Sequence, residues 1–190
     1  MLDVSPLMNF LQTILIFVFA MLTVFGQAVF PGVRHLLGAQ MDLLPVLMVY
    51  AALNASITTV TLLAIFGGLS FDALSANPLG VTILPLFAVG FVILSQREFI
   101  LHKLSFAQII LGAVACAVVP ALTVLLLLTG GTQPLLGWGS LWQWLVMTAG
   151  GAVATPIIFA LFDWCNHALG YQRRTETSFR PDREIHRGRK

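Results

Sequence analysis

One aspartate stands out among the side chains of this sequence that could do chemistry. Asp72 lies between two apolar runs, Leu43–Phe66 and Val81–Leu94, and neither run contains a charged residue. A carboxylate at the centre of a membrane helix costs about 2.5–3.5 kcal/mol, so such a residue usually faces protein or water rather than lipid. We therefore expect neighbouring protein to shelter Asp72, which would anchor either a partner helix or the chain's own turn.

The segment around Asp72 combines helix-breaking residues with small polar ones. The helix breakers are Gly67, Gly68, Pro78 and Gly80, and the small polar residues are Ser70, Ser75 and Asn77. Non-helical backbone at membrane depth is tolerated only where protein or water satisfies it. We predict that residues 67–80 form the functional centre, as a partner-binding or structural motif. A simpler interpretation also stays open, in which Asp72 is a turn aspartate satisfied by backbone N–H groups at a helix end.

The other reactive side chains indicate packing rather than catalysis. Asp163 and His167 have i, i+4 spacing, which predicts a pair on one helix face at the membrane interface. Cys116 and Cys165 fall inside apolar runs without metal-ligand spacing, so we expect core residues. The sequence contains no phosphate-binding loop, zinc-protease motif or nucleophile elbow. We therefore expect a protein that is not an enzyme, with no catalytic residue, cofactor or metal.

Composition indicates a membrane protein. Of the 190 residues, 58% are hydrophobic and only 9% are charged, against roughly 25% charged residues in a soluble domain. The apolar runs are continuous, which excludes a membrane barrel with its alternating pattern. The fold prediction is an all-α, polytopic helical membrane protein, with a transmembrane domain over residues 1–170.

The last segment, residues 171–190, differs in composition from the rest. It holds seven basic and three acidic residues and few apolar ones, which is typical of a disordered tail. Such a tail can anchor the protein on anionic membrane lipids, or it can dock a cytoplasmic protein. We therefore expect membrane lipids or a cytoplasmic protein as partners of the tail, and no nucleic acid.

Apolar runs and breakers predict about six spans. They cover residues 7–30, 43–53, 57–74, 81–99, 106–128 and 142–168. The second and third spans are short and separated by a polar patch, in which Asn54, Ser56, Thr58 and Thr59 are expected to hydrogen-bond between helices, or else to line a substrate pocket. Without a break there, one tilted helix would replace the two and leave five spans.

The prolines and tryptophans of the later spans predict further detail. Pro120 and Pro156 are expected to bend their helices. Trp138, Trp142 and Trp144 are expected to form an interfacial belt beside an uncharged turn.

The basic residues predict orientation. The tail and the loop Arg97–Lys103 are two spans apart, so they share a side, and together they carry nine of the ten basic residues. The positive-inside rule then places the C-terminus in the cytoplasm and the Asp72 segment toward the outer side. The N-terminus is cytoplasmic with six spans and external with five.

The motif at 67–80 resembles a known family. Gly68-Leu69-Ser70-Phe71-Asp72 followed by Pro78-Leu79-Gly80, with Pro45 opening an earlier span, is similar to the core of the rod shape-determining MreD proteins. The resemblance implies a non-enzymatic component of the bacterial cell-wall elongation machinery, located in the inner (cytoplasmic) membrane and maintaining cell shape.

The same resemblance implies partners and a fold. The partners would be an MreC-like single-span protein, an MreB-like cytoskeletal protein, and the glycosyltransferase and transpeptidase that build peptidoglycan. A groove shaped by the Asp72 segment would accept the MreC-like helix. The implied fold is similar to the substrate-binding components of energy-coupling-factor transporters, so the alternative function is capture of a vitamin on the outer face.

Overall fold

The computed structural model of the protein describes residues 4–29, 38, 42–75, 78–98, 105–131 and 137–168. These residues form helices and contain no strand. The helices are α1 (Val4–Val29), α3 (Leu44–Asn54), α4 (Ile57–Leu74), α5 (Ile83–Gln96), α6 (Ser105–Thr129) and α7 (Trp138–Ala168). By length and composition, α1, α4, α6 and α7 can each cross a membrane, whereas α3 and α5 are shorter apolar helices. The predicted all-α fold, with several helices apolar and long enough to cross a membrane, is thereby confirmed, while six spans stay a prediction.

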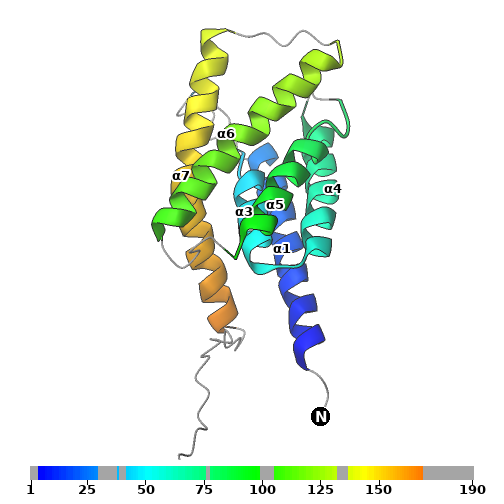
Figure 1. The fold of residues 1–190 in the computed structure, drawn as a ribbon, viewed down its shortest axis with the longest axis vertical. Coiled ribbons are helices and arrows are strands. Elements are labelled where there is room, and N and C mark those ends of the chain that lie inside the picture. Colours follow the sequence, from blue (N-terminus) through cyan, green and yellow to red (C-terminus); the bar gives the residue numbers. More distant parts are fainter. Residues whose placement is uncertain are drawn as a thin grey trace, which may run out of the picture.

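Helix α3 is the centre of the bundle. Every residue from Leu44 to Leu53 is buried, and α3 contacts each of the other five described helices (Figure 1). A helix that is hydrophobic all round is expected to be buried in this way. Its eleven residues extend only about 16 Å at 1.5 Å per residue, roughly half of a ~30 Å hydrocarbon core. The prediction of a short segment packed on neighbours is confirmed.

The polar patch after α3 breaks the chain where the sequence predicts it. Ser56 caps α4, because its hydroxyl accepts a hydrogen bond from the Thr59 N–H at 3.4 Å. The Thr59 hydroxyl lies 3.1 Å from that of Thr13 on α1, and Gln12 of α1 donates to the Asn54 carbonyl at 3.4 Å. These bonds tie α1 to the α3–α4 turn. The Thr59 side chain makes the predicted bond between helices, while Thr58 is exposed.

Aromatic rings join α3 to α7 and α1. Tyr50 is fully buried and stacks on Phe162 with ring centroids 4.1 Å apart, while Phe159 meets it edge-on at 5.1 Å. Phe19 of α1 also packs against Phe162, with ring centroids 4.7 Å apart. The Tyr50 hydroxyl is within 3.4 Å of the Asn166 amide, so the buried polar end of the ring is also satisfied.

Helices α6 and α7 cross at two glycines. A Cβ atom on Gly112 would collide with Thr155 Oγ1 and with the Gly151 carbonyl oxygen, and one on Gly151 would collide with Cys116 Sγ. Small residues let membrane helices approach closely, and this pair therefore sets the α6–α7 distance. Cys116 is buried here as a free thiol, in agreement with its predicted packing role.

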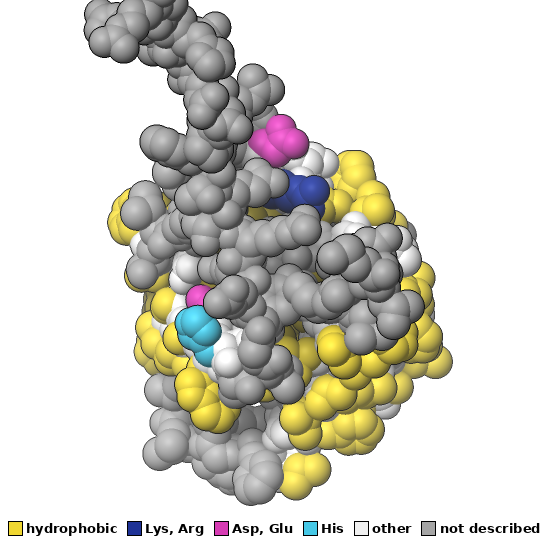
Figure 2. All heavy atoms as spheres, turned by 90° about the horizontal axis from the view of Figure 1, so that it is seen from below, with side chains coloured by type: hydrophobic (Ala, Val, Ile, Leu, Met, Phe, Trp, Pro, Cys, Tyr) yellow, Lys and Arg dark blue, Asp and Glu magenta, His cyan; other side chains and the backbone are white. Residues whose placement is uncertain are grey.

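The two ends of the bundle differ. In Figure 1 the N-terminal end of α1 and the C-terminal end of α7 lie at the lower end, and the α4–α5 connection lies at the upper end. Arg97 donates to the Ala55 carbonyl at 3.3 Å, which puts it at the lower end beside the α3–α4 turn. The predicted separation of the Asp72 segment from Arg97 is confirmed. Figure 2 looks at the lower end and shows the charged side chains of the described residues there, with hydrophobic side chains on the flanks of the bundle.

Several helix boundaries differ from the prediction, and the largest difference is at the start of α7. Helix α7 begins at Trp138 rather than Trp142, because the Gly137 carbonyl already accepts the N–H groups of Ser140 and Leu141. The three tryptophans therefore belong to the first two turns of α7 and not to a preceding turn. The predicted tail 171–190, residues 33–37 and 39–41 of the predicted linker, and Asn77 lie outside the described residues.

Candidate functional site

The Asp72 connection joins the end of α4 to the start of α5. Asp72 lies on the last turn of α4 and is only 1% exposed. Its carboxylate accepts hydrogen bonds from the Gly80 N–H at 2.9 Å and the Thr82 N–H at 3.1 Å, and from the Thr82 hydroxyl. The expectation that protein shelters this acid is confirmed.

The geometry gives the carboxylate a capping role. Thr82 precedes α5 and makes no side-chain cap of its own, so Asp72 satisfies its backbone N–H from the preceding helix. A negative charge at a helix N-terminus is also favoured by the helix dipole. Because both carboxylate oxygens are used within the chain, the contacts favour the turn-aspartate interpretation over an anchor for a partner helix.

The backbone of the connection requires glycine at one point. Gly80 has φ of +93°, a conformation that side chains disfavour, and it presents its N–H to Asp72. Pro78 begins the preceding turn, in which its carbonyl accepts the Val81 N–H at 3.4 Å. Pro78 itself is exposed, so its contribution is to the turn and not to the buried contacts.

The two glycines of the motif bring α3 and α5 against α4. A Cβ on Gly67 would lie 3.0 Å from Leu44 Cδ1, and a Cβ on Gly68 would lie 3.0 Å from the Ile83 Cα. The predicted motif residues thus act together, since Gly67 and Gly68 set the helix distances and Asp72 closes the connection above them.

Asp42 is a site residue that the sequence reasoning missed. It is 6% exposed, and its Oδ1 accepts the Leu44 N–H at 2.9 Å just before α3 begins. Asp72 is therefore not the only buried carboxyl group among the described residues. The missed signal was an aspartate immediately before a wholly apolar helix, where Asp commonly satisfies free N–H groups.

Burial raises the pKa of the Asp42 carboxyl from 3.8 to about 6, the Leu44 N–H opposes this shift, and the nearby Asp72 charge adds to it. A carboxyl whose pKa rises on folding stabilises the fold below its unfolded pKa. This contribution is lost as the pH rises from about 4 through 6, and the loss is on the order of 3 kcal/mol.

Asp42→Asn should therefore match the wild type at pH 4 and melt at a higher temperature at pH 7, because asparagine keeps an acceptor for Leu44 without the charge. Thermal unfolding in detergent between pH 4 and 7 measures this. A difference between the two proteins that does not change with pH would contradict the assignment.

The other predicted candidates lie away from Asp72. Asp163 and His167 are on the last turns of α7, at the lower end of the bundle, as the predicted topology requires. No group of three or more His, Cys, Asp or Glu side chains that could hold a metal occurs within the described ranges.

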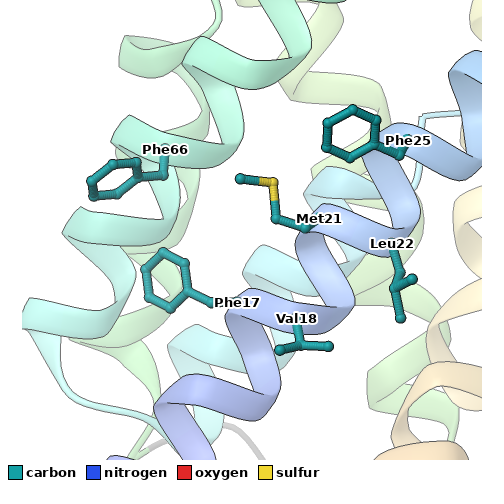
Figure 3. A pocket seen from close by; sticks show the side chains of 6 residues that line it. All are labelled: Phe17, Val18, Met21, Leu22, Phe25 and Phe66. Atoms are coloured by element: carbon teal, nitrogen blue, oxygen red, sulfur yellow. The ribbon is translucent and has the colours of Figure 1, made fainter.

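An apolar groove runs between α1 and α4. It has a volume of about 460 Å³, and Figure 3 shows side chains of α1 reaching toward Phe66 of α4. Phe17 meets Phe66 edge-on at 6.1 Å at one side of the groove, and Leu22 and Phe25 are more than half exposed. The lining residues are Phe17, Val18, Met21, Leu22, Phe25 and Phe66. One wall of this groove is α4, the helix that carries Asp72. No charged or polar side chain lines the groove.

Comparison with known proteins gives no match: no family model matches this chain, and no curated protein or solved structure is significantly similar to it.

Proposed function

We propose that this chain is a non-enzymatic scaffold of the MreD type in the bacterial inner membrane, where it serves the cell-wall elongation complex and maintains cell shape. The sequence likeness at residues 67–80 supports this proposal. The chain would cross the membrane six times, with α3 and α5 as the short segments, and both termini would be cytoplasmic.

The partner surface is the groove between α1 and α4, which would accept the single transmembrane helix of an MreC-like protein. The observation that carries this step is the wholly apolar lining of the groove, together with the exposure of Leu22, Phe25 and Phe66. Lipid offers no hydrophobic drive for helix association, so complementary packing supplies the binding energy. Asp72 contributes indirectly, by fixing α4 against α5.

The remaining partners are the MreB-like protein and the wall-synthesis glycosyltransferase and transpeptidase. An MreB-like protein is cytoplasmic and would meet the lower end of the bundle, beside Arg97 and the basic tail. A vitamin-binding function has less support, because the α1–α4 groove has no polar or charged side chain to orient a small molecule.

The test is a Val18→Trp substitution, which fills the groove from its α1 wall. Co-purification of the co-expressed MreC-like protein should fall about tenfold, which corresponds to about 1.4 kcal/mol of lost binding energy. Val114→Trp is the matched control, because Val114 is similarly exposed (52% against 48%) but lies on α6. Equal recovery of the partner with both variants would overturn the proposed groove.

A further inference from the structure

A second groove opens between the C-terminal half of α6 and the first turns of α7. Its volume is about 1010 Å³, at the upper end of the ~300–1,000 Å³ range of small-molecule sites. In Figure 1 the two helices diverge toward the upper end. The apolar walls are formed by Pro120, Ala121 and Val124 of α6 and by Leu141, Trp144 and Met147 of α7.

The groove is closed at its lower end. The Trp144 indole N–H donates to the Ala117 carbonyl at 2.9 Å and so bridges α7 to α6. The neighbouring carbonyl, that of Cys116, lacks its usual helical hydrogen bond, because Pro120 has no N–H to donate. Below this bridge, α6 and α7 cross in direct contact at Gly112 and Gly151.

The length of the groove indicates whether a helix or a lipid chain can bind in it. From Trp138 to Met147 the rise along α7 is about 14 Å, roughly half of a ~30 Å hydrocarbon core. A spanning helix needs the full thickness, which the groove does not reach. A lipid chain from one leaflet needs only half the thickness, so the closed groove fits a lipid and not a helix.

The mouth of the groove is polar but uncharged. Ser140 and Gln143 line it together with Gly137 and Gly139, and Trp138 beside them is 86% exposed. Exposed indoles are typical of the headgroup level of a membrane. The only Lys or Arg among the described residues is Arg97, which lies at the other end of the bundle. Among the described residues, the mouth therefore offers a headgroup hydrogen-bonding side chains and no cationic one.

We propose that this groove is a binding site for one zwitterionic phospholipid of the leaflet at the Asp72 end, with an acyl chain between α6 and α7 and its headgroup at Ser140 and Gln143. The lipid fills the space between Pro120, Ala121 and Val124 of α6 and the first turns of α7. This site is separate from the α1–α4 groove, and its test involves no protein partner.

The test measures retained lipid by native mass spectrometry. The protein is reconstituted in vesicles of equal parts phosphatidylethanolamine and phosphatidylglycerol and then extracted in mild detergent. We expect one retained phosphatidylethanolamine per chain, and at least a fivefold loss in Ala121→Trp, which fills the groove. Val114→Trp, on an exposed face of the same helix, should retain the lipid. Ser140→Ala with Gln143→Ala should remove the preference for phosphatidylethanolamine.

Three results would overturn the proposal. They are a wild-type protein without retained lipid, equal retention in Ala121→Trp, and a preference for phosphatidylglycerol. Circular dichroism and the elution volume report whether Ala121→Trp is folded. If it is not, Met147→Trp fills the same groove from the opposite wall and is read in the same way.

Discussion

Asp72→Asn is expected to lower the free energy of unfolding by about 2–4 kcal/mol. The carboxylate accepts bonds from two backbone N–H groups and one hydroxyl at a buried position. A hydrogen bond to a charged group is worth about 1.5–3 kcal/mol, and a buried donor left without an acceptor costs about 1–3 kcal/mol. The asparagine NH2 group would face these donors with a further donor. Thermal unfolding in detergent measures the loss.

The matched control is Glu98→Gln, because Glu98 is exposed at the end of the bundle opposite Asp72. This substitution also replaces a carboxylate by an amide, and surface changes are usually within about 0.5 kcal/mol. If Asp72→Asn is as stable as Glu98→Gln, the carboxylate does not hold the α4–α5 connection. The capping role described above would then be wrong.

Gly112→Ala is expected to destabilise the α6–α7 pair by about 2–3 kcal/mol. The new methyl group would collide with Thr155 Oγ1 and with the Gly151 carbonyl oxygen, and the latter is backbone and cannot rotate away. Overpacking in a tight interface typically costs about 1–3 kcal/mol. The melting temperature in detergent reports this change, and a crosslink between α6 and α7 would report their separation.

Gly26→Ala in α1 is the control for this glycine. It makes the same substitution inside a helix, but a Cβ there would meet nothing within 4 Å. Alanine favours the helix over glycine by about 1 kcal/mol, so Gly26→Ala should be neutral or stabilising. If Gly112→Ala and Gly26→Ala change the melting temperature in the same direction and by the same amount, the α6–α7 crossing is less tight than described.

Each of the two proposed binding grooves lies beside a tight contact between helices. Helix α4 is fixed against α5 at the Asp72 connection, while its outer face with α1 leaves an apolar groove. Helices α6 and α7 are fixed at Gly112 and Gly151 but separate toward the upper end. In both cases a tight contact determines where the neighbouring surface stays open, so substitutions at the contacts are expected to change binding at the grooves.

Much of this architecture follows from the sequence. Continuous apolar runs require helices in a membrane, because the backbone must satisfy its own hydrogen bonds there. The hydrogen-bonding residues from Asn54 to Thr59 predicted the α3–α4 break, because these side chains compete for backbone groups and cap helices. A carboxylate without a nearby opposite charge predicted a sheltered Asp72, since exposure to lipid would be costly.

Only the tertiary structure decided which groups provide the shelter and what lies beside them. The donors to Asp72 come from Gly80 and Thr82 across a connection, and the burial of Asp42 depends on helices that are distant in sequence. The order of apolar residues specifies that α3 is buried but not which five helices surround it. Hydropathy is a property of each segment, whereas a groove or a helix crossing depends on the distances between segments, which are set by packing.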